Sequence, residues 1–582
     1  MVFLFGDRDP RRLPRLLSPQ VAPSWADLIA FVGLAAIAVS ILRGAHEMGA
    51  PLSALQARPV TLDPLRLPEY ALLTTLRMFA ALAASLAFTF VVATAAAKSR
   101  RAELVIVPAL DILQSVPVLG FLTFTVTFFM SLFPARELGV ELAAIFAIFT
   151  SQAWNMAFSF YQSLRTVPKD LDEVARQFAF SPWRRFVRLE LPFATPSLVW
   201  NMMMSMSGGW FFVVASEAIS VSNQNIKLPG VGSYIAMAIE ARDLGAIGWA
   251  IGGMLVGIVL YDQLFFRPLI AWADKFRFEE SGSEDAPRSW LLTWLRRTDR
   301  LQRIGLGIAR LLERSLLVLR RDHDGTSIKA RPRPPHRAAE RVWDATLAAA
   351  VLLAVVWLVR FIHTEVGWAE VVHVFVLGLF TLARVLVLIA LAALVWVPFG
   401  IWVGMNPRWA GRLQGVAQFL AAFPANLMFP VAVLFIARWH LNPNIWLSPL
   451  MVLGTQWYLL FNVIAGASGV PTELRHAARN LGLSGWLRWR RYLLPAVFPS
   501  FVTGAITASG GSWNASIVAE YVSWGDTTLQ ADGLGSYIAH MTAIGDFPRI
   551  ALGIGVMCVF VMALNHFVWR RLYELAENRM HF

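Results

Sequence analysis

The sequence predicts an all-α, polytopic membrane protein made of two tandem domains of six helices each, about twelve membrane-spanning helices in one chain. Two observations carry this prediction. Hydrophobic residues make up 57% of the 582 residues, and the mean hydropathy is +0.55, which is well above the balance of soluble domains. The second observation is an internal repeat, in which both halves of the chain carry the same motifs at a constant spacing.

The repeat is clearest in two polar segments, 168–192 and 471–495. Both segments begin and end with proline. Downstream, Trp210 and Glu217 match Trp513 and Glu520, and the separation stays at 303 positions (520 − 217). A period of this length is too long for a solenoid and indicates one domain that was duplicated and fused.

Continuous apolar runs predict helical spans, because the strands of a membrane barrel would alternate apolar and polar residues. In the first half the predicted spans are 25–43, 71–97, 104–133, 140–164, 193–217 and 245–269. In the second half they are 343–362, 375–404, 412–437, 445–467, 496–520 and 549–570. The resulting parts are a basic cytoplasmic N-terminus (1–24), a first transmembrane domain (25–271), a basic cytoplasmic linker (272–341) and a second transmembrane domain (342–582).

Lysine and arginine between the apolar runs set the predicted orientation. The net charge is +13, and its placement between spans is typical of cytoplasmic loops rather than of nucleic-acid binding. Placing these loops in the cytoplasm puts both termini inside. The first apolar run lacks a small-residue cleavage site, so we expect a retained anchor. With Cys558 as the single cysteine, no disulfide can form within the chain.

The linker contains an amphipathic pattern at 289–321, where apolar residues recur at helical spacing with arginines between them. A basic amphipathic helix of this kind is typical of a segment lying on the inner leaflet. A helix packed on a neighbouring protein surface is the alternative. Residues 322–337 contain Gly325 and three prolines and are expected to be disordered.

Each polar segment of the repeat combines a short helical pattern with a Leu-Pro step into the next apolar run. The positions in the first segment are Glu173, Ala175, Arg176, Ala179, Leu191 and Pro192. Those in the second are His476, Ala478, Arg479, Gly482, Leu494 and Pro495. The pattern resembles the coupling loop of ABC importer permeases, which reads Glu-Ala-Ala, three residues, Gly, nine residues, Ile-x-Leu-Pro. The surrounding sequence is most similar to the nitrate, sulfonate, taurine and bicarbonate group, in a duplicated form.

The resemblance implies two type I ABC importer transmembrane domains in a bacterial cytoplasmic (inner) membrane. It implies that each polar segment docks a short helix on one of two ATPase subunits, which bind ATP and Mg. A periplasmic or lipid-anchored solute-binding protein would deliver a small, anionic solute. The sequence itself has no P-loop and no zinc or nucleophile motif, so we expect a non-catalytic chain with no cofactor, no metal and no nucleic-acid partner. His476 at the Glu position predicts that the two ATPase contacts are unequal.

Polar residues within the fifth span of each half form the predicted translocation path. They are Asn201, Ser205, Trp210, Glu217, Trp513, Asn514, Ser516 and Glu520. Ionisable groups within a membrane rarely face lipid. The alternative for the serines and asparagines is contact between helices, because small and hydroxyl side chains let helices approach closely.

A repeated ion pair near the outer face is also predicted, Arg77 with Glu217 and Arg384 with Glu520. At about 1.5 Å per residue, the helix that follows Pro192 has crossed the hydrocarbon by Glu217. Arg77 lies about two turns into a span that enters from outside, so both charges reach a similar depth. A lone buried charge is costly, which makes mutual pairing one interpretation. The alternative is that each arginine reaches the lipid headgroups and each glutamate caps a nearby backbone turn.

Two other classes of protein were weighed against this prediction. A secondary solute transporter with an internal repeat is the first, although its repeats are commonly inverted, whereas six spans per half make these copies parallel. A polytopic membrane enzyme is the second, and it requires clustered catalytic residues that the sequence does not display.

Overall fold

The computed structural model describes residues 59–579 with gaps. The gaps are 116–117, 135, 179, 222–223, 277–288, 296–344, 347–348, 350–351, 354–355, 407–408, 410–412, 414–415, 417–419, 421–422, 471 and 525–526. The predicted first span (25–43), most of the amphipathic linker pattern and Ala179 therefore lie outside the described residues. The span predicted at 343–362 is described only in part.

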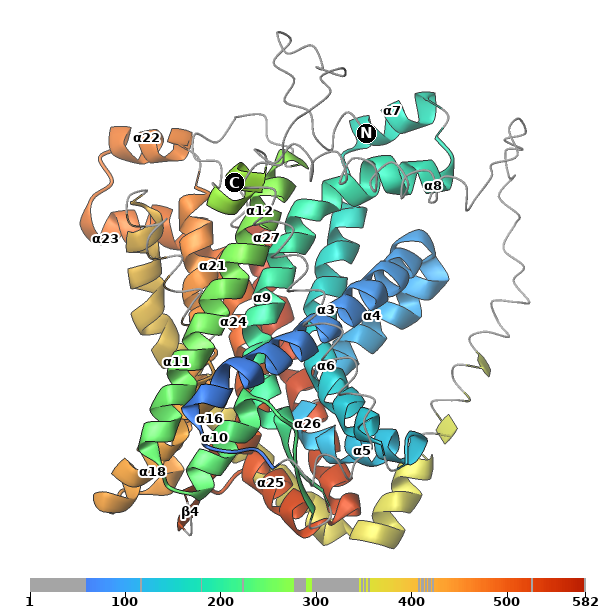
Figure 1. The fold of residues 1–582 in the computed structure, drawn as a ribbon. Helices are drawn as coiled ribbons and strands as arrows, with labels where there is room; N and C mark the ends of the chain where they lie inside the picture. The colour runs from blue at the N-terminus through green and yellow to red at the C-terminus, as the bar shows by residue number, and fades with distance from the viewer. Residues whose placement is uncertain are drawn as a thin grey trace, which may run out of the picture. The chain divides into compact units, whose positions relative to one another are not determined.

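The described chain is almost entirely helical, as predicted (Figure 1). Among the described residues, seven helices are long and apolar enough to cross a membrane, and a helix pair bent by 43° brings the number to eight if the pair forms one span. The seven are Pro64–Lys98, Glu137–Arg165, Pro182–Glu217, Leu244–Phe276, Trp368–Gly404, Gly485–Ala519 and Phe547–Ala576. The bent pair is Pro443–Leu453 with Gln456–Ser468. These helices coincide with eight of the predicted spans.

The third predicted span of the first half, 104–133, is described as two helices on either side of residues 116–117, which lie outside the described residues. Helix α4 (Arg100–Ser115) ends before α5 (Val118–Leu132) begins. In the second half, Pro424 is extended (φ −72°, ψ 108°) and precedes the short helix η6 (Ala425–Met428) and α18 (Phe429–Arg438). Pro117 stands 307 positions earlier (424 − 117), the separation that also relates Arg77 to Arg384. Proline lacks an N–H and disfavours helical geometry in the residue before it, so averaged hydropathy missed the break that Pro424 indicates in the second half.

The described segments after the fifth spans contain two strands and a helix in each half. In the first half, strands β1 (Ala218–Val221) and β2 (Gln224–Lys227) form an antiparallel hairpin that leads into α10 (Val231–Glu240). In the second, β3 (Tyr521–Trp524) and β4 (Thr527–Gln530) lead into α25 (Leu534–Ile544). Ala218 pairs with Lys227 and Tyr521 with Gln530, so the strand register also repeats after 303 positions.

The described residues fall into two compact units. One unit contains Ser159–Asn201 and the described part of Leu260–Arg341, and the other contains the remaining described helices of both halves. In the second unit, α16 (Trp368–Gly404), α21 (Gln456–Ser468) and α24 (Leu494–Ala519) pack against one another (Figure 1). Their core is a cluster around Ile401, Val463 and Val497, which are all less than 2% exposed.

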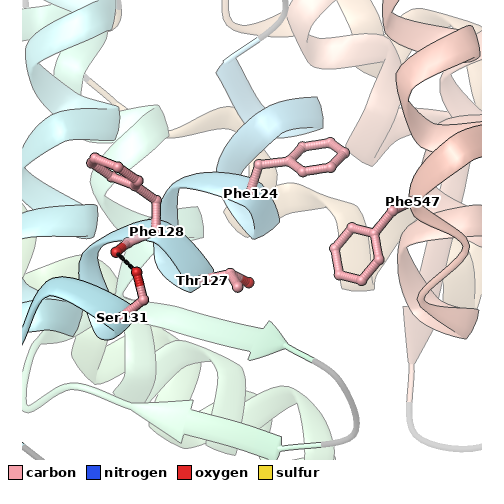
Figure 2. A pocket seen from close by; sticks show the side chains of 5 residues that line it. All are labelled: Phe124, Thr127, Phe128, Ser131 and Phe547. Carbon is pink, nitrogen blue, oxygen red and sulfur yellow. Dashed lines mark hydrogen bonds between the residues drawn. The ribbon is translucent and has the colours of Figure 1, made fainter. Parts of the chain in front are cut away.

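The two halves of the repeat meet within this second unit. The side-chain Oδ1 of Asn514 on α24 accepts a hydrogen bond of 2.8 Å from the backbone N–H of Val118, where α5 begins. The rings of Phe124 on α5 and Phe547 on α26 (Phe547–Leu564) lie 5.3 Å apart. Figure 2 shows these two rings beside an open hollow of about 410 Å³, whose other lining side chains come from α5.

A second contact between the halves predicts the effect of a glycine substitution. A Cβ atom added at Gly208 on α9 (Leu191–Glu217) would lie 2.5 Å from the Tyr458 hydroxyl oxygen on α21. We expect Gly208→Ala to lower the thermal stability of the purified protein. Gly510→Ala is the control, because a Cβ atom added there meets nothing within 4 Å. It should leave the free energy of unfolding unchanged or raise it by up to about 1 kcal/mol through helix propensity.

The Tyr458→Phe background distinguishes this contact from a general effect of alanine. Without the hydroxyl, the nearest atom to the added methyl is the Tyr458 Cζ at 3.8 Å, an ordinary packing distance. The double variant should therefore regain most of the lost stability. Equal melting shifts for Gly208→Ala in both backgrounds would contradict this contact.

Candidate functional site

The first polar segment of the repeat folds as a short helix, a turn and a second helix that continues into a span. Helix α7 (Lys169–Gln177) is followed by α8 (Pro182–Arg185), the π-helix η2 (Phe186–Glu190) and α9. The N–H of Phe180 closes α7 by donating to the Ala175 carbonyl over 3.0 Å. Ala175 is buried, whereas Glu173 and Arg176 are exposed, so the latter two side chains lie at the surface of the segment.

Ion pairs hold the two short helices of this segment together. The Asp172 carboxylate receives Arg176 over 2.7 Å and Arg185 over 2.8 Å. Arg185 also lies 3.0 Å from the buried Glu190. The charges of α7, α8 and η2 are thus linked inside the segment.

The second polar segment has the same backbone plan. Helix α22 (Thr472–Asn480) precedes α23 (Gly485–Arg488), the π-helix η7 (Trp489–Leu493) and α24. The N–H of Leu483 donates to the Ala478 carbonyl over 3.0 Å, which repeats the bond between Phe180 and Ala175. Gly482 has φ +65°, a left-handed conformation that glycine adopts without steric cost.

The Leu-Pro step marks the start of the fifth span in both halves. Leu191 and Pro192 are the first two residues of α9, and Leu494 and Pro495 are the first two of α24. Each proline stands where the π-helix η2 or η7 passes into the α-helical part of one continuous helix. In the second segment His476 and Arg479 are exposed and Ala478 is buried. These positions agree with the pattern read from the sequence, and their role in coupling stays a prediction.

The predicted ion pair of the first half is confirmed, and it is part of a larger network. The Arg77 Nη1 lies 2.8 Å from the Glu217 carboxylate, and both side chains are at most 2% exposed. Arg77 also forms a bidentate contact with Glu141, at 2.6 Å through Nε and 2.6 Å through Nη2. The Thr74 hydroxyl donates to Glu217 over 2.7 Å. Two buried carboxylates therefore share one guanidinium.

This network ties the segment after the β1–β2 hairpin and α10 to α3 (Leu67–Lys98). Arg77 donates to the Pro229 carbonyl over 2.8 Å, and the Gly232 N–H donates to Glu217 over 2.7 Å. The Val231 N–H donates to the Thr74 hydroxyl over 3.0 Å. Hydrogen bonds to ionised groups are the stronger kind, so the start of α10 is fixed to the end of the fifth span.

The predicted ion pair of the second half is also confirmed. The Arg384 Nη1 lies 2.9 Å from Glu520, and the Thr381 hydroxyl donates to the same carboxylate over 2.9 Å. The Gly535 N–H donates to Glu520 over 2.8 Å, as Gly232 does to Glu217. The second contact of Arg384 differs, because its Nη2 donates over 3.0 Å to Asn444, which stands 303 positions after Glu141.

The other predicted path residues lie at contacts between helices or are fully buried. Asn201 donates to Ser159 over 2.8 Å, and Ser205 accepts from Asn155 over 3.3 Å. Trp210 and Trp513 are at most 1% exposed. Ser516 is buried and donates to the carbonyl of Trp513, whereas Asn514 is half-buried where the halves meet. These contacts are of the helix-packing kind, and the path itself stays a prediction.

Sequence reasoning missed Thr74, Glu141, Thr381 and Asn444. The threonines had a visible signal, because Thr stands three residues before Arg in both halves. Glu141 had none, since its repeat partner is an asparagine. Among the described residues, no group of three or more His, Cys, Asp or Glu side chains is arranged to hold a metal ion.

The duplicated helical plan, the apolar spans and the buried charge networks define a multi-pass membrane protein with an internal repeat, of the kind that moves solutes. More particularly, the chain belongs to the family described as binding-protein-dependent transport system inner membrane component, which matches residues 86–265 and again residues 396–582. Members of this family are transport permeases, the non-catalytic membrane subunits of ABC transporters.

Relatives within this family carry several solutes. The chain is 29% identical over 142 residues to the bicarbonate transport system permease protein CmpB of Synechococcus elongatus, covering 24% of this chain and 50% of CmpB. It is 26% identical over 195 residues to the nitrate import permease protein NrtB of Leptolyngbya laminosa, covering 33% and 66%. It is 27% identical over 230 residues to the osmoprotectant import permease protein OsmY of Salmonella typhimurium, covering 39% and 91%. Each alignment is shorter than one period of the repeat.

Proposed function

We propose that this chain is the fused permease subunit of an ATP-driven importer, in which both halves together form the path for one solute. The observation that carries the proposal is the duplicated helix-turn-helix segment, α7–α8 and α22–α23, which leads without interruption into the fifth span of each half. A rigid connection of this kind can transmit movement of a docked partner to the membrane. A connector between two spans would not need the same turn, closing bond and spacing twice.

The proposed complex contains one copy of this chain, two ATPase subunits and a solute-binding protein. ATP and Mg bind to the ATPase subunits, and no cofactor binds to this chain. The two polar segments of the repeat, 168–192 and 471–495, are called the coupling segments from here on. Both of them and both termini face the cytoplasm, in keeping with the lysines and arginines between spans. Cysteines placed in the coupling segments, in a background without Cys558, should accordingly be unreactive to impermeant maleimide in intact cells.

A polar stripe on α24 supports a path through the second half. Thr503 and Thr507 are exposed in the middle of this span, and a Cβ atom added at Gly510 would meet nothing within 4 Å. The exposed face of α16 instead carries Leu394 and Val395, as expected of a surface in contact with lipid. Because polar side chains rarely face lipid, the stripe on α24 is suited to line a watery path.

The solute class proposed here is a small anion. The support is the relatedness to permeases for bicarbonate and nitrate. One relative is an osmoprotectant import permease, so an osmoprotectant is the alternative solute class. Uptake into proteoliposomes should therefore be compared for nitrate, bicarbonate and a zwitterionic osmolyte, each with its binding protein.

Co-purification tests the proposal. Tagged chain, purified from cells in a mild detergent, should bring down ATPase subunits with a P-loop, and ATP should be required for uptake by the reconstituted complex. Uptake that is driven by an ion gradient with no ATPase present would overturn the proposal in favour of a secondary transporter.

A further inference from the structure

We propose that the second coupling segment (471–495) docks on an ATPase surface rich in carboxylates, that the first (168–192) docks on a less acidic one, and that the chain therefore works with two different ATPase subunits. This rests on the proposed function, because it assumes that both segments contact ATPases. It goes further by naming the chemistry of each contact.

The two segments differ in acidic residues and not in basic ones. Each contains five lysines and arginines, but the first has four acidic residues and the second has one, so their net charges are +1 and +4. The rule that places positive loops in the cytoplasm counts lysine and arginine. It accounts for the basic residues of both segments and leaves the loss of carboxylates in the second unexplained.

The lost carboxylates are those that neutralise arginines inside the first segment. Asp172 and Glu190, which hold Arg185, correspond to Arg475 and Leu493. Within the described residues, Arg479 and Arg488 have no carboxylate partner, although their counterparts Arg176 and Arg185 do. The exposed guanidinium groups of Arg479 and Arg488 are therefore placed to meet carboxylates of another molecule.

Apolar side chains beside these arginines complete the proposed docking surface. Leu481 and Trp486 are 75% and 73% exposed, and Leu487 is 53% exposed. Interfaces are commonly built from an apolar centre that includes Trp and Arg, with a charged rim. A groove with an apolar floor and acidic edges would match this surface.

Anionic headgroups could also satisfy arginine and tryptophan, but the shared backbone plan favours a protein. Both segments have the same pair of short helices and the same closing bond at Phe180 and Leu483. A conserved scaffold indicates one docking mode in both halves, and the change of charge then alters the partner's surface rather than the kind of partner.

Photo-crosslinking from two matched positions tests the inference. Gln177 and Asn480 are exposed, stand at the ends of α7 and α22 and are 303 positions apart. Each is replaced by cysteine in a Cys558→Ala background, labelled with benzophenone maleimide in the purified complex and irradiated. We expect the two positions to form adducts with different ATPase polypeptides, and the peptides near Asn480 to be richer in Asp and Glu.

Charge reversal provides the second measurement. Arg479→Glu should release ATPase from the complex at a salt concentration that leaves the parent intact, with affinity lowered about tenfold, which is about 1.4 kcal/mol. Arg176→Glu should have a smaller effect, because Arg176 is already paired with Asp172. Rim charges act mainly through salt-dependent association, so both variants are compared over a salt series.

The possible results of these experiments test the inference and the proposed function separately. Adducts on the same peptide of one ATPase, with equal effects of the two reversals, would overturn the inference and leave the proposed function standing. Adducts with lipid alone at Asn480 would overturn the inference, because they would show that the second segment docks on lipid headgroups and not on an acidic protein surface. No ATPase adduct at either position would overturn the proposed function itself.

Discussion

Replacing Arg77 by methionine is expected to abolish transport and to prevent most of the chain from reaching a stable fold. Arg77 is the shared counter-charge of Glu141 and Glu217, and all three side chains are at most 3% exposed. Removing one partner of a buried ion pair costs about 3–5 kcal/mol, and here two carboxylates lose their partner together. The fraction of monodisperse protein after detergent extraction and the solute uptake of proteoliposomes measure the effect.

Arg384→Met is the matched control, with a smaller expected loss. Arg384 has one buried carboxylate partner, Glu520, its other contact is the neutral Asn444, and its side chain is 13% exposed. Combining Arg77→Met with Glu141→Gln and Glu217→Gln removes all three charges and should recover folded protein. Equal losses at Arg77 and Arg384, without recovery in the triple variant, would show that the charges are not what stabilises this region.

Gly482→Val is expected to uncouple ATP hydrolysis from transport while the chain still inserts and assembles its spans. A β-branched residue at φ +65° is strongly disfavoured, and left-handed backbone costs about 1–2 kcal/mol for residues with a Cβ. The turn between α22 and α23 should therefore rearrange. We expect substrate-stimulated ATPase activity of the reconstituted complex to fall about tenfold, equivalent to about 1.4 kcal/mol.

Gly469→Val is the control for adding a valine side chain near the second coupling segment. Gly469 caps α21 with a right-handed φ of −77°, and an added Cβ atom there would make only ordinary contacts, the nearest at 3.5 Å. This variant should retain most of the stimulation. If both variants stimulated normally, the left-handed turn at Gly482 would have no part in coupling.

The Arg77–Glu217 pair could be predicted because two independent signals agreed. Helix length placed the two charges at a similar depth, and both recurred in the second half as Arg384 and Glu520. Glu141 could not be found in this way. Its counterpart is Asn444, so the repeat, which was the main source of information, gave no sign that a second carboxylate joins the site.

The errors in the predicted spans arise because hydropathy was averaged over long stretches of sequence. Hydropathy over 104–133 is high on both sides of Pro117, so the run was read as one helix where the structure has α4 and α5. The hairpins at Ala218–Lys227 and Tyr521–Gln530 were also missed, because strands of four residues carry too short an alternation to be distinguished from a polar loop. Local backbone preference decided both cases more than average polarity did.

The interrupted third helix has an energetic consequence for the transport cycle. The N–H that begins α5 is bonded by Asn514 from the opposite half of the chain. In an apolar surrounding, a backbone N–H that loses its acceptor costs about 1–3 kcal/mol. Under the proposed function, an arrangement that separates α5 from α24 without letting water replace this bond would bear the cost, which would favour the joined arrangement about 5- to 150-fold. The side chain of Asn514 would then bias the permease before any solute or nucleotide binds.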